Sequence, residues 1–221
     1  MLHLGDEEMT EDLKNRILER ARKEGFQMVS LKSSEPITCS HFQPVGTLLE
    51  FTATIEGMWE HLQDVPLRGL IRKIEPCDWP GIEDLLQFSS PTRFSKDSRL
   101  SPETVQRHKL RMLQVYAEKH PDSSLVTFTD KNLKPVAGLQ VSYFDNKGVR
   151  LYEVLVRPEY RKGFIALGLL AQNVRNFMSR GLSKSEVRTH IYEDNTSSIR
   201  LFEKLGCRST GAKDHYYHLW S

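Results

Sequence analysis

The chain has 221 residues, 38% of them hydrophobic, which is enough to bury the core of one large domain or of a domain with a smaller companion. It carries 31 Lys and Arg against 29 Asp and Glu, and this net charge of +2 excludes a general electrostatic attraction to nucleic acid or to an acidic membrane. No stretch approaches the ~20 apolar residues of a membrane helix, and the acidic start predicts no signal peptide.

The three cysteines, Cys39, Cys77 and Cys207, are scattered and odd in number, which is typical of neither a disulfide framework nor a zinc site. The eight histidines form no metal-binding pair, so we expect no metal. We therefore expect a soluble protein of the reducing cytoplasm, with no nucleic-acid or membrane partner.

Residues 1–68 predict a small α/β part. A helix is expected at 9–23, where apolar residues share one helical face. Residues 26–31 and 47–55 are rich in β-branched and aromatic residues and predict strands. The stretch 57–67 contains Gly and Pro without periodicity, so we place the boundary with the second part, 69–221, close to it.

From Leu70 the pattern alternates between strands and helices. In chain order we expect a strand at 70–74, a helix from Asp78, a second helix from Ser101 to His120, strands at 125–129, 136–144 and 149–156, a helix at 167–178, a strand at 186–192, a helix at 195–205, and a final hairpin of 207–210 with 215–220. This order predicts an α/β (α+β) fold built on a mixed sheet.

Two stretches carry a family resemblance. Residues 156–161 read VRPEYR and precede a turn and a helix, and residues 195–207 read NTSSIRLFEKLGC. With the order of elements, they resemble the GNAT superfamily of acyl-CoA-dependent N-acetyltransferases from about Leu70 to the C-terminus. The resemblance implies the GNAT fold, with residues 1–68 as a small N-terminal α/β part.

The resemblance implies acetyl-CoA as the acyl donor. A helix N-terminus offers unpaired N–H groups and partial positive charge to a pyrophosphate, and nearby basic residues add formal charge. The implied cofactor-binding residues are Leu155, Val156, Arg157, Arg161, Lys162, Gly163, Phe164, Ile165 and Ala166 in the first stretch, and Asn195, Ser198 and Phe202 in the second. Phe164 departs from the family, which usually has glycine there. The alternatives are an ordinary strand-to-helix connection and, for Asn195, a helix N-cap.

The chemistry implied is attack of an amine on a thioester, which requires a proton acceptor and a stabilised oxyanion. The resemblance makes Glu153 the base and places the oxyanion near the N–H of Leu155 or Val156. Many family members protonate the leaving sulfur with a tyrosine, but this sequence has Phe202 at that position. Tyr192, Tyr216 or Tyr217 could substitute, although buried tyrosines often only pack and form hydrogen bonds. The alternative is a member that binds acyl-CoA without transferring the acyl group.

The loop 89–99 is expected to wall the acceptor site, where the basic and aromatic residues Arg93, Phe94 and Arg99 suit a small-molecule amine that is phosphorylated or nucleotide-linked. Together with the N-terminal α/β part and the C-terminal aromatic residues, this loop is also similar to TDP-fucosamine acetyltransferases, which acetylate the 4-amine of a nucleotide-linked sugar. The alternative is an exposed loop without a ligand. We expect a monomer or a homodimer.

The residues from Leu18 to Phe26 repeat the pattern of those from Leu201 to Cys207, which is a charged helix end, a glycine and an apolar strand start. The N-terminal part is therefore a candidate for a degenerate half-copy of the fold. The alternative is chance, because helices commonly end at glycine.

Overall fold

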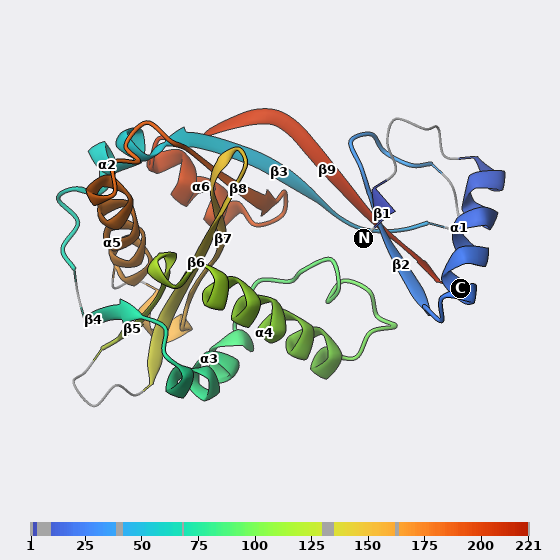
Figure 1. Ribbon diagram of the computed structural model, residues 1–221, viewed down its shortest axis with the longest axis horizontal. Helices are drawn as coiled ribbons and strands as arrows, with labels where there is room; N and C mark the ends of the chain where they lie inside the picture. Colours follow the sequence, from blue (N-terminus) through green and yellow to red (C-terminus); the bar gives the residue numbers. More distant parts are fainter. Residues whose placement is uncertain are drawn as a thin grey trace.

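The computed structural model describes residues 2–3, 10–38, 42–67, 69–129, 135–161 and 164–220. Within these ranges nine strands form one sheet, and six α-helices pack around it (Figure 1). The helices are α1 (Glu11–Lys23), α2 (Ile55–Leu62), α3 (Trp79–Leu86), α4 (Pro102–Lys119), α5 (Ile165–Ser179) and α6 (Thr196–Lys204). The strands are β1 (Leu2–His3), β2 (Met28–Ser33), β3 (Gln43–Thr54), β4 (Leu70–Lys73), β5 (Ser124–Phe128), β6 (Val136–Asp145), β7 (Gly148–Val156), β8 (Glu186–Tyr192) and β9 (Arg208–Trp220).

The strand order is β1-β2-β9-β3-β8-β7-β6-β5-β4. The strands from β4 to β7 pair antiparallel, whereas β7 and β8 pair parallel and are joined through α5. The predicted mixed α/β fold is therefore confirmed. In the part of the chain that the structure describes, no helix is both long and apolar enough to cross a bilayer.

The N-terminal part contributes a central strand to this sheet. Strand β3 pairs antiparallel with β8 on one side and with β9 on the other, so that Phe51 lies opposite Thr189 and also opposite Ser209. In Figure 1, β3 and β9 run side by side from the larger body to the lobe that holds α1 and β2. The division near residue 68 stays a prediction, and the sheet runs across it.

Helices cover both faces of the sheet. Neighbouring residues of β7 point to opposite faces: Leu155 packs in the cluster with α3 and α4, and Val156 packs against Ile165 of α5. Helix α2 joins α5 in the largest cluster, and α1 covers β2 in a separate one. The face toward α4 is the one that carries the candidate site.

The predicted C-terminal hairpin is wrong, because 208–220 is one continuous strand. Lys213 pairs with Leu49 and Ser209 with Phe51, so the residues between them form a bulge around Gly211, whose φ is +81°. Strand β3 occupies the place beside β9 that a second hairpin strand would take. The glycine therefore indicated a bulge and not a turn.

The sequence also failed to predict α2. Thr54 caps this helix by accepting a hydrogen bond from Gly57 N–H, and Ile55, Met58 and Leu62 are fully buried on one face. The spacing of these three residues is helical, but Gly57 and Pro66 obscured it.

We expect Phe51→Ala to lower the free energy of unfolding by about 3–5 kcal/mol, because the ring is 2% exposed in the largest core cluster. Unfolding should stay a single transition, since β3 belongs to the common sheet. Urea denaturation followed by circular dichroism and by fluorescence measures both. Phe26→Ala is the matched control: its ring is 56% exposed, and we expect a loss below about 1 kcal/mol. A small effect of Phe51→Ala would contradict the central position of β3.

Candidate active site

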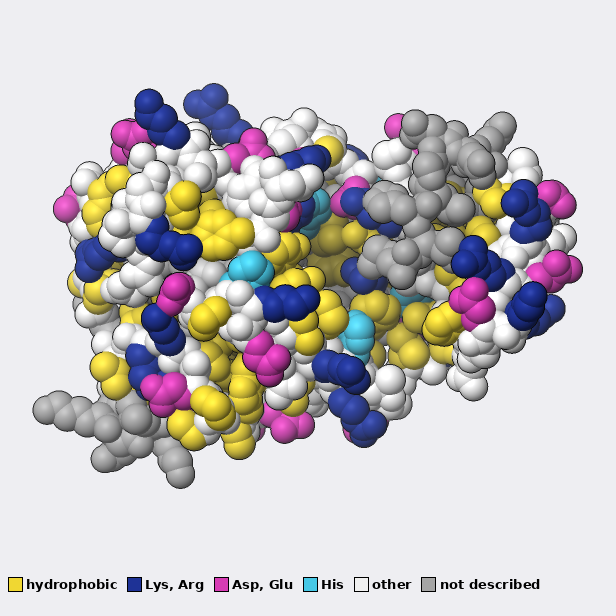
Figure 2. Space-filling model, viewed as in Figure 1, with side chains coloured by type: hydrophobic (Ala, Val, Ile, Leu, Met, Phe, Trp, Pro, Cys, Tyr) yellow, Lys and Arg dark blue, Asp and Glu magenta, His cyan; other side chains and the backbone are white. Residues whose placement is uncertain are grey.

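A cavity of about 450 Å³ lies between α4, the loop before it and the sheet, a size suited to one small molecule. Figure 2 shows the molecule hollowed near the middle of this view, with hydrophobic, histidine and basic side chains around the hollow. Of the residues predicted from sequence, the cavity brings together Arg93, Phe94, Glu153, Tyr192, Asn195, Ser198 and Phe202. It does not include Leu155, Val156, Arg157, Arg161, Phe164, Ile165, Ala166 or Arg99. Lys162 and Gly163 lie outside the described residues.

A β-bulge directs Glu153 into the cavity. Val141 of β6 pairs with Glu153 while Ser142 pairs with Leu151, so Tyr152 is the extra residue on β7. Without the bulge, Tyr152 and Glu153 would point to opposite faces of the sheet. With it, both side chains lie on the face that α4 covers and line the cavity.

Strands β7 and β8 separate beside this bulge. Their parallel pairing extends from Val149 to Leu151, and beyond Leu151 no described residue of β7 pairs with β8. Arg157 N–H donates to Ala137 O at 2.9 Å, and because hydrogen-bonded pairs alternate along an antiparallel ladder, Leu155 N–H also bonds β6. The N–H groups of Val154 and Val156 therefore face the opening, whereas the N–H of Leu155 points toward β6.

Glu153 is held by a lysine and lies beside tyrosines. Lys109 Nζ of α4 lies 3.0 Å from Glu153 Oε2, and both side chains are largely buried. The rings of Tyr116 and Tyr143 stack with centroids 4.6 Å apart, and Tyr152 lies 4.6 Å from Tyr116. Burial raises the pKa of Tyr152, so its hydroxyl stays neutral. The lysine and the aromatic rings were not predicted from sequence.

Tyr192 stands across the cavity at the end of β8. Its hydroxyl accepts a hydrogen bond of 2.6 Å from Arg93 N–H, which leaves its own proton available for donation. Burial raises the pKa of Tyr192, although Arg93 opposes that rise. The ring of Tyr192 leaves no room for a side chain at residue 46, because a Cβ on Gly46 would lie 2.8 Å from Tyr192 Cε1.

Asn195 is the N-cap of α6, since its side-chain oxygen accepts from Ser198 N–H at 3.2 Å. Its amide nitrogen donates to Ser90 Oγ at 3.3 Å, which ties α6 to the loop that closes the cavity. Phe202, one turn beyond Ser198, is 5% exposed and presents a ring without a hydroxyl. The capping interpretation of Asn195 therefore holds, and its amide group also lies at the cavity wall.

Phe164, the residue before α5, has the left-handed backbone conformation that glycine favours. Phe164 has φ 63° and ψ 11°, and it is the one non-glycine residue with positive φ in the described ranges. This left-handed conformation costs about 1–2 kcal/mol for a residue with a Cβ. Gly168 N–H makes a helical bond to Phe164 O at 2.8 Å, so the N–H groups of Ile165 and Ala166 lie at the helix start without an intrahelical partner.

Two arginines near this turn differ in their partners. Arg161 donates to the carbonyls of Val156, at 3.2 Å, and Phe88, at 3.0 Å, and no ion pair with a described carboxylate balances its charge. Arg157 is 7% exposed and bonds Val136 O and the carboxylate of Asp84. Arg161 is therefore available to an anion, whereas the predicted cofactor role of Arg157 has no geometric support.

The loop 89–101 is anchored by Asp97. This carboxylate is 1% exposed and accepts hydrogen bonds from Arg99, from His218 Nδ1 at 2.8 Å and from Trp220 Nε1 at 2.9 Å. Burial raises the pKa of Asp97, but these hydrogen bonds outweigh it and hold the pKa well below its usual range. Arg99 thus holds the anchoring carboxylate, stacks over Trp220 and does not line the cavity, so its predicted substrate role has no support in this geometry.

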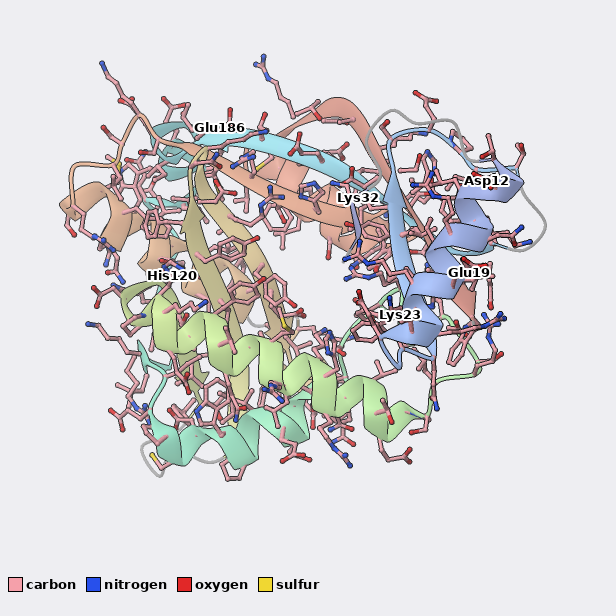
Figure 3. The ribbon with its side chains drawn as sticks, turned by 45° about the vertical axis from the view of Figure 1, so that its right-hand side comes forward. Asp12, Glu19, Lys23, Lys32, His120 and Glu186 are labelled. Atoms are coloured by element: carbon pink, nitrogen blue, oxygen red, sulfur yellow. The ribbon has the colours of Figure 1, made fainter. Side chains whose placement is uncertain are left out.

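Charged residues missed from sequence line the far side of the cavity. Lys32 Nζ of β2 lies 2.7 Å from Asp214 Oδ2 of β9, and His190 Nε2 of β8 lies 3.3 Å from the same carboxylate. Figure 3 shows Lys32 on the side of β2 away from α1. Alternation within β8 could have indicated His190, but nothing local indicated that β2 would reach this cavity.

The comparison with protein families identifies the chain. The model of the acetyltransferase (GNAT) family matches residues 79–207, which is more than half of the sequence. The protein therefore belongs to the GNAT family, as the resemblance predicted. No curated protein matches the chain in sequence.

Solved structures share the fold at low sequence identity. A tandem GNAT protein from the clavulanic acid biosynthesis pathway has a TM-score of 0.66 at 12% identity, covering 95% of this chain and 69% of its own. A GCN5-related N-acetyltransferase from Sphaerobacter thermophilus has 0.59 at 16%, covering 91% and 64%. A PaiA N-acetyltransferase from Thermoplasma acidophilum in complex with coenzyme A has 0.51 at 17%, covering 69% and 98%.

We expect Asp97→Asn to lower the free energy of unfolding at pH 7 by about 3–5 kcal/mol, because it removes the buried charge that three donors share. The native pKa is depressed, so the stability contributed by the charge is present above the unfolded pKa of about 3.9 and is lost as pH falls below it. The difference in the free energy of unfolding between wild type and Asp97→Asn should therefore become smaller as the pH falls from about 5 to about 2. Urea denaturation across this range measures it.

Asp122→Asn is the control for this experiment, because the ion pair of Asp122 with Lys73 is exposed to solvent. We expect it to cost below about 1 kcal/mol. A gap between Asp97→Asn and wild type that stays constant with pH would contradict the linkage.

Proposed function

We propose that this protein transfers an acetyl group from acetyl-CoA to a primary amine held in the cavity. The observation that carries the proposal is the position of Glu153, which a bulge turns into the cavity beside the opening between β7 and β8. Membership of the GNAT family supports acyl-CoA-dependent acetyl transfer as the class of activity. Free thiols at Cys77 and Cys207 favour a reducing cytoplasm as the location.

The residues around the β7–α5 turn fit coenzyme A. The start of α5 presents N–H groups of Ile165 and Ala166, and Arg161 supplies a charge that no described carboxylate neutralises. Phe164, directly before these N–H groups, has the left-handed conformation that a glycine adopts without strain. Acetyl-CoA would supply an acyl thioester whose sulfur is a good leaving group.

Two backbone groups and one carboxylate have the positions that acyl transfer needs. Glu153 accepts the proton of the attacking amine, and Lys109 holds the carboxylate in place. The N–H groups of Val154 and Val156 face the opening, where they stabilise negative charge that develops on a carbonyl oxygen.

Protonation of the leaving sulfur falls to Tyr192 in this proposal. Phe202 cannot donate a proton, whereas the Tyr192 hydroxyl lines the same cavity and keeps its proton. A thiol has a pKa of about 8.5, so a thiolate also leaves without full protonation. The donor is therefore helpful and not obligatory.

The amine of a nucleotide-linked sugar is one acceptor that the loop supports. Arg93 and Phe94 line the cavity and could meet a phosphate and a base or sugar ring. Arg99 and Lys96 cannot share this task, because Asp97 and Asp194 hold them. A smaller amine uses the same two residues.

The second candidate is a module that binds acyl-CoA without turnover. Phe202 favours it, because the residue has no proton to give. The ion pair of Glu153 with Lys109 favours it too, because the lysine competes for the carboxylate that must accept a proton. Acetyl-CoA binding without transfer to any amine would select this function.

We expect Arg161→Ala to weaken acetyl-CoA binding by about 1.5–3 kcal/mol, the value of a hydrogen bond to a charged group. Isothermal titration calorimetry measures the dissociation constant. Arg20→Ala is the control, since Arg20 is an exposed arginine of α1 that pairs with Glu24. Equal affinities of wild type and Arg161→Ala for acetyl-CoA would contradict the proposal that the pyrophosphate binds at this turn.

We expect Glu153→Gln to lower kcat by about 10²–10⁴-fold, the usual range for loss of a general base, with little change in acetyl-CoA affinity. Release of free thiol in the presence of a pool of primary amines measures the rate. Asp122→Asn is the control, because it also removes a carboxylate paired with a lysine but lies outside the cavity. Wild-type turnover in Glu153→Gln would eliminate the proposed base.

A further inference from the structure

We propose that the amine acceptor carries an oxyanion, a carboxylate or a phosphate, and that Arg93 binds it. This inference rests on the proposed function and names the class of its acceptor. The observation behind it is a cation in the cavity wall that no described carboxylate balances, on a loop that the structure holds firmly.

The backbone and side chain of Arg93 are both fixed. Its N–H donates to Tyr192 Oη at 2.6 Å, and four residues further along Asp97 anchors the same loop to β9. The guanidinium carbon lies 4.5 Å from the ring centre of Phe94 and 4.6 Å from that of Tyr216. Contacts of this kind cover the faces of the guanidinium, and part of its N–H edge meets the Tyr192 hydroxyl. The remaining N–H groups are left for in-plane hydrogen bonds.

The other lysines and arginines that line the cavity have acidic partners. Lys32 pairs with Asp214 at 2.7 Å and Lys109 with Glu153 at 3.0 Å, and Arg150 Nε lies 3.7 Å from Asp145 Oδ2. Among the described residues, no carboxylate forms an ion pair with Arg93.

The Arg93 Nε is moreover buried without a hydrogen-bond partner. A buried donor without a partner costs about 1–3 kcal/mol, and a partly buried charge without a counter-ion costs more. An oxyanion of the ligand would accept a hydrogen bond from Nε and would also balance the charge of the guanidinium. Carboxylates and phosphates can do this through two parallel hydrogen bonds to an arginine.

The charge of Arg93 acts on the cavity itself. Burial lowers the pKa of His108 and the charge of Arg93 lowers it further, while the same charge opposes the rise that burial causes in the pKa of Tyr216. Both residues line the cavity. The field of the Arg93 charge therefore reaches into the cavity from the wall formed by the loop, whereas Glu153 lies on the sheet.

This arrangement selects a bifunctional acceptor. The amine goes to Glu153 and the oxyanion to Arg93, and the aromatic rings of Tyr116, Tyr152 and Tyr216 line the space for the skeleton that joins them. An amine without an acidic group would leave the Arg93 charge unbalanced in a cavity emptied of water. Amino acids and amino phosphates have the required pair of groups.

The test uses the full chain with acetyl-CoA and matched probes. One pool contains the common amino acids and the other their decarboxylated amines, and phosphoethanolamine is compared with ethanolamine. We expect kcat/KM at least about 10-fold higher for an acidic probe than for its neutral partner, the value of one charge-assisted hydrogen bond. Arg93→Gln should abolish this preference by lowering kcat/KM for the acidic probe alone.

Arg99→Gln is the matched control, because Arg99 lies on the same loop and stacks over an aromatic ring but is outside the cavity. It should lower the thermal stability and keep the preference. Equal use of acidic and neutral amines by the wild type would overturn the inference and leave the proposed function standing. A succinyl-CoA arm separates the sources: if Arg93→Gln penalises succinyl transfer and not the acidic acceptor, the oxyanion belongs to the acyl group and the inference fails.

If acetyl-CoA binds but no amine is acetylated, the proposed function fails, and thermal shifts with the same pools decide the anion site separately. Stabilisation by the acidic pool alone, lost in Arg93→Gln, would retain an oxyanion site in the cavity. Equal shifts with both pools would overturn it.

Discussion

The insertion of β3 between β8 and β9 is the constraint on which the rest of the structure depends. A strand inside a sheet satisfies the backbone groups of both neighbours, and here one 12-residue strand of the N-terminal part pairs with two strands of the C-terminal part. Its registers place Glu50 opposite His190, and Leu48 opposite both Tyr192 and Asp214. Side chains from strands far apart in sequence thus reach one face and form the wall of the cavity.

Local irregularities then convert a regular sheet into a site. The bulge at Tyr152 turns Glu153 toward α4, and the separation of β7 from β8 beyond Leu151 frees N–H groups of β7. Phe164 holds a left-handed conformation that its side chain disfavours. Strained backbone of this kind persists where the surrounding structure fixes it, and it is concentrated at binding sites. Phe164 therefore has, directly before α5, a backbone conformation that glycine adopts without strain.

Sequence patterns predicted the elements that local periodicity determines and missed those set by distant partners. Strand β8 (Glu186–Tyr192) matches its predicted bounds, because alternation and flanking turn residues define it. The continuity of β9 depends on β3, which lies more than 150 residues earlier, and Lys109 meets Glu153 only through the packing of α4. Gly25, Gly181 and Gly206 all have positive φ after a helix, so the repeated pattern in the N-terminal part is too general to establish a half-copy.

The N-terminal part contributes a charged side chain to the cavity as well as strands to the sheet. Lys32 is on β2, whose opposite face packs on α1 through Leu31, and its ammonium neutralises Asp214, a carboxylate that also accepts from His190. Burial raises the pKa of Asp214, and these hydrogen bonds outweigh it and lower the pKa. A ligand that binds only the native cavity must therefore stabilise β2 together with the site, because binding to the native state alone raises the free energy of unfolding. The lobe that looks separate in Figure 1 is in this sense one wall of the site.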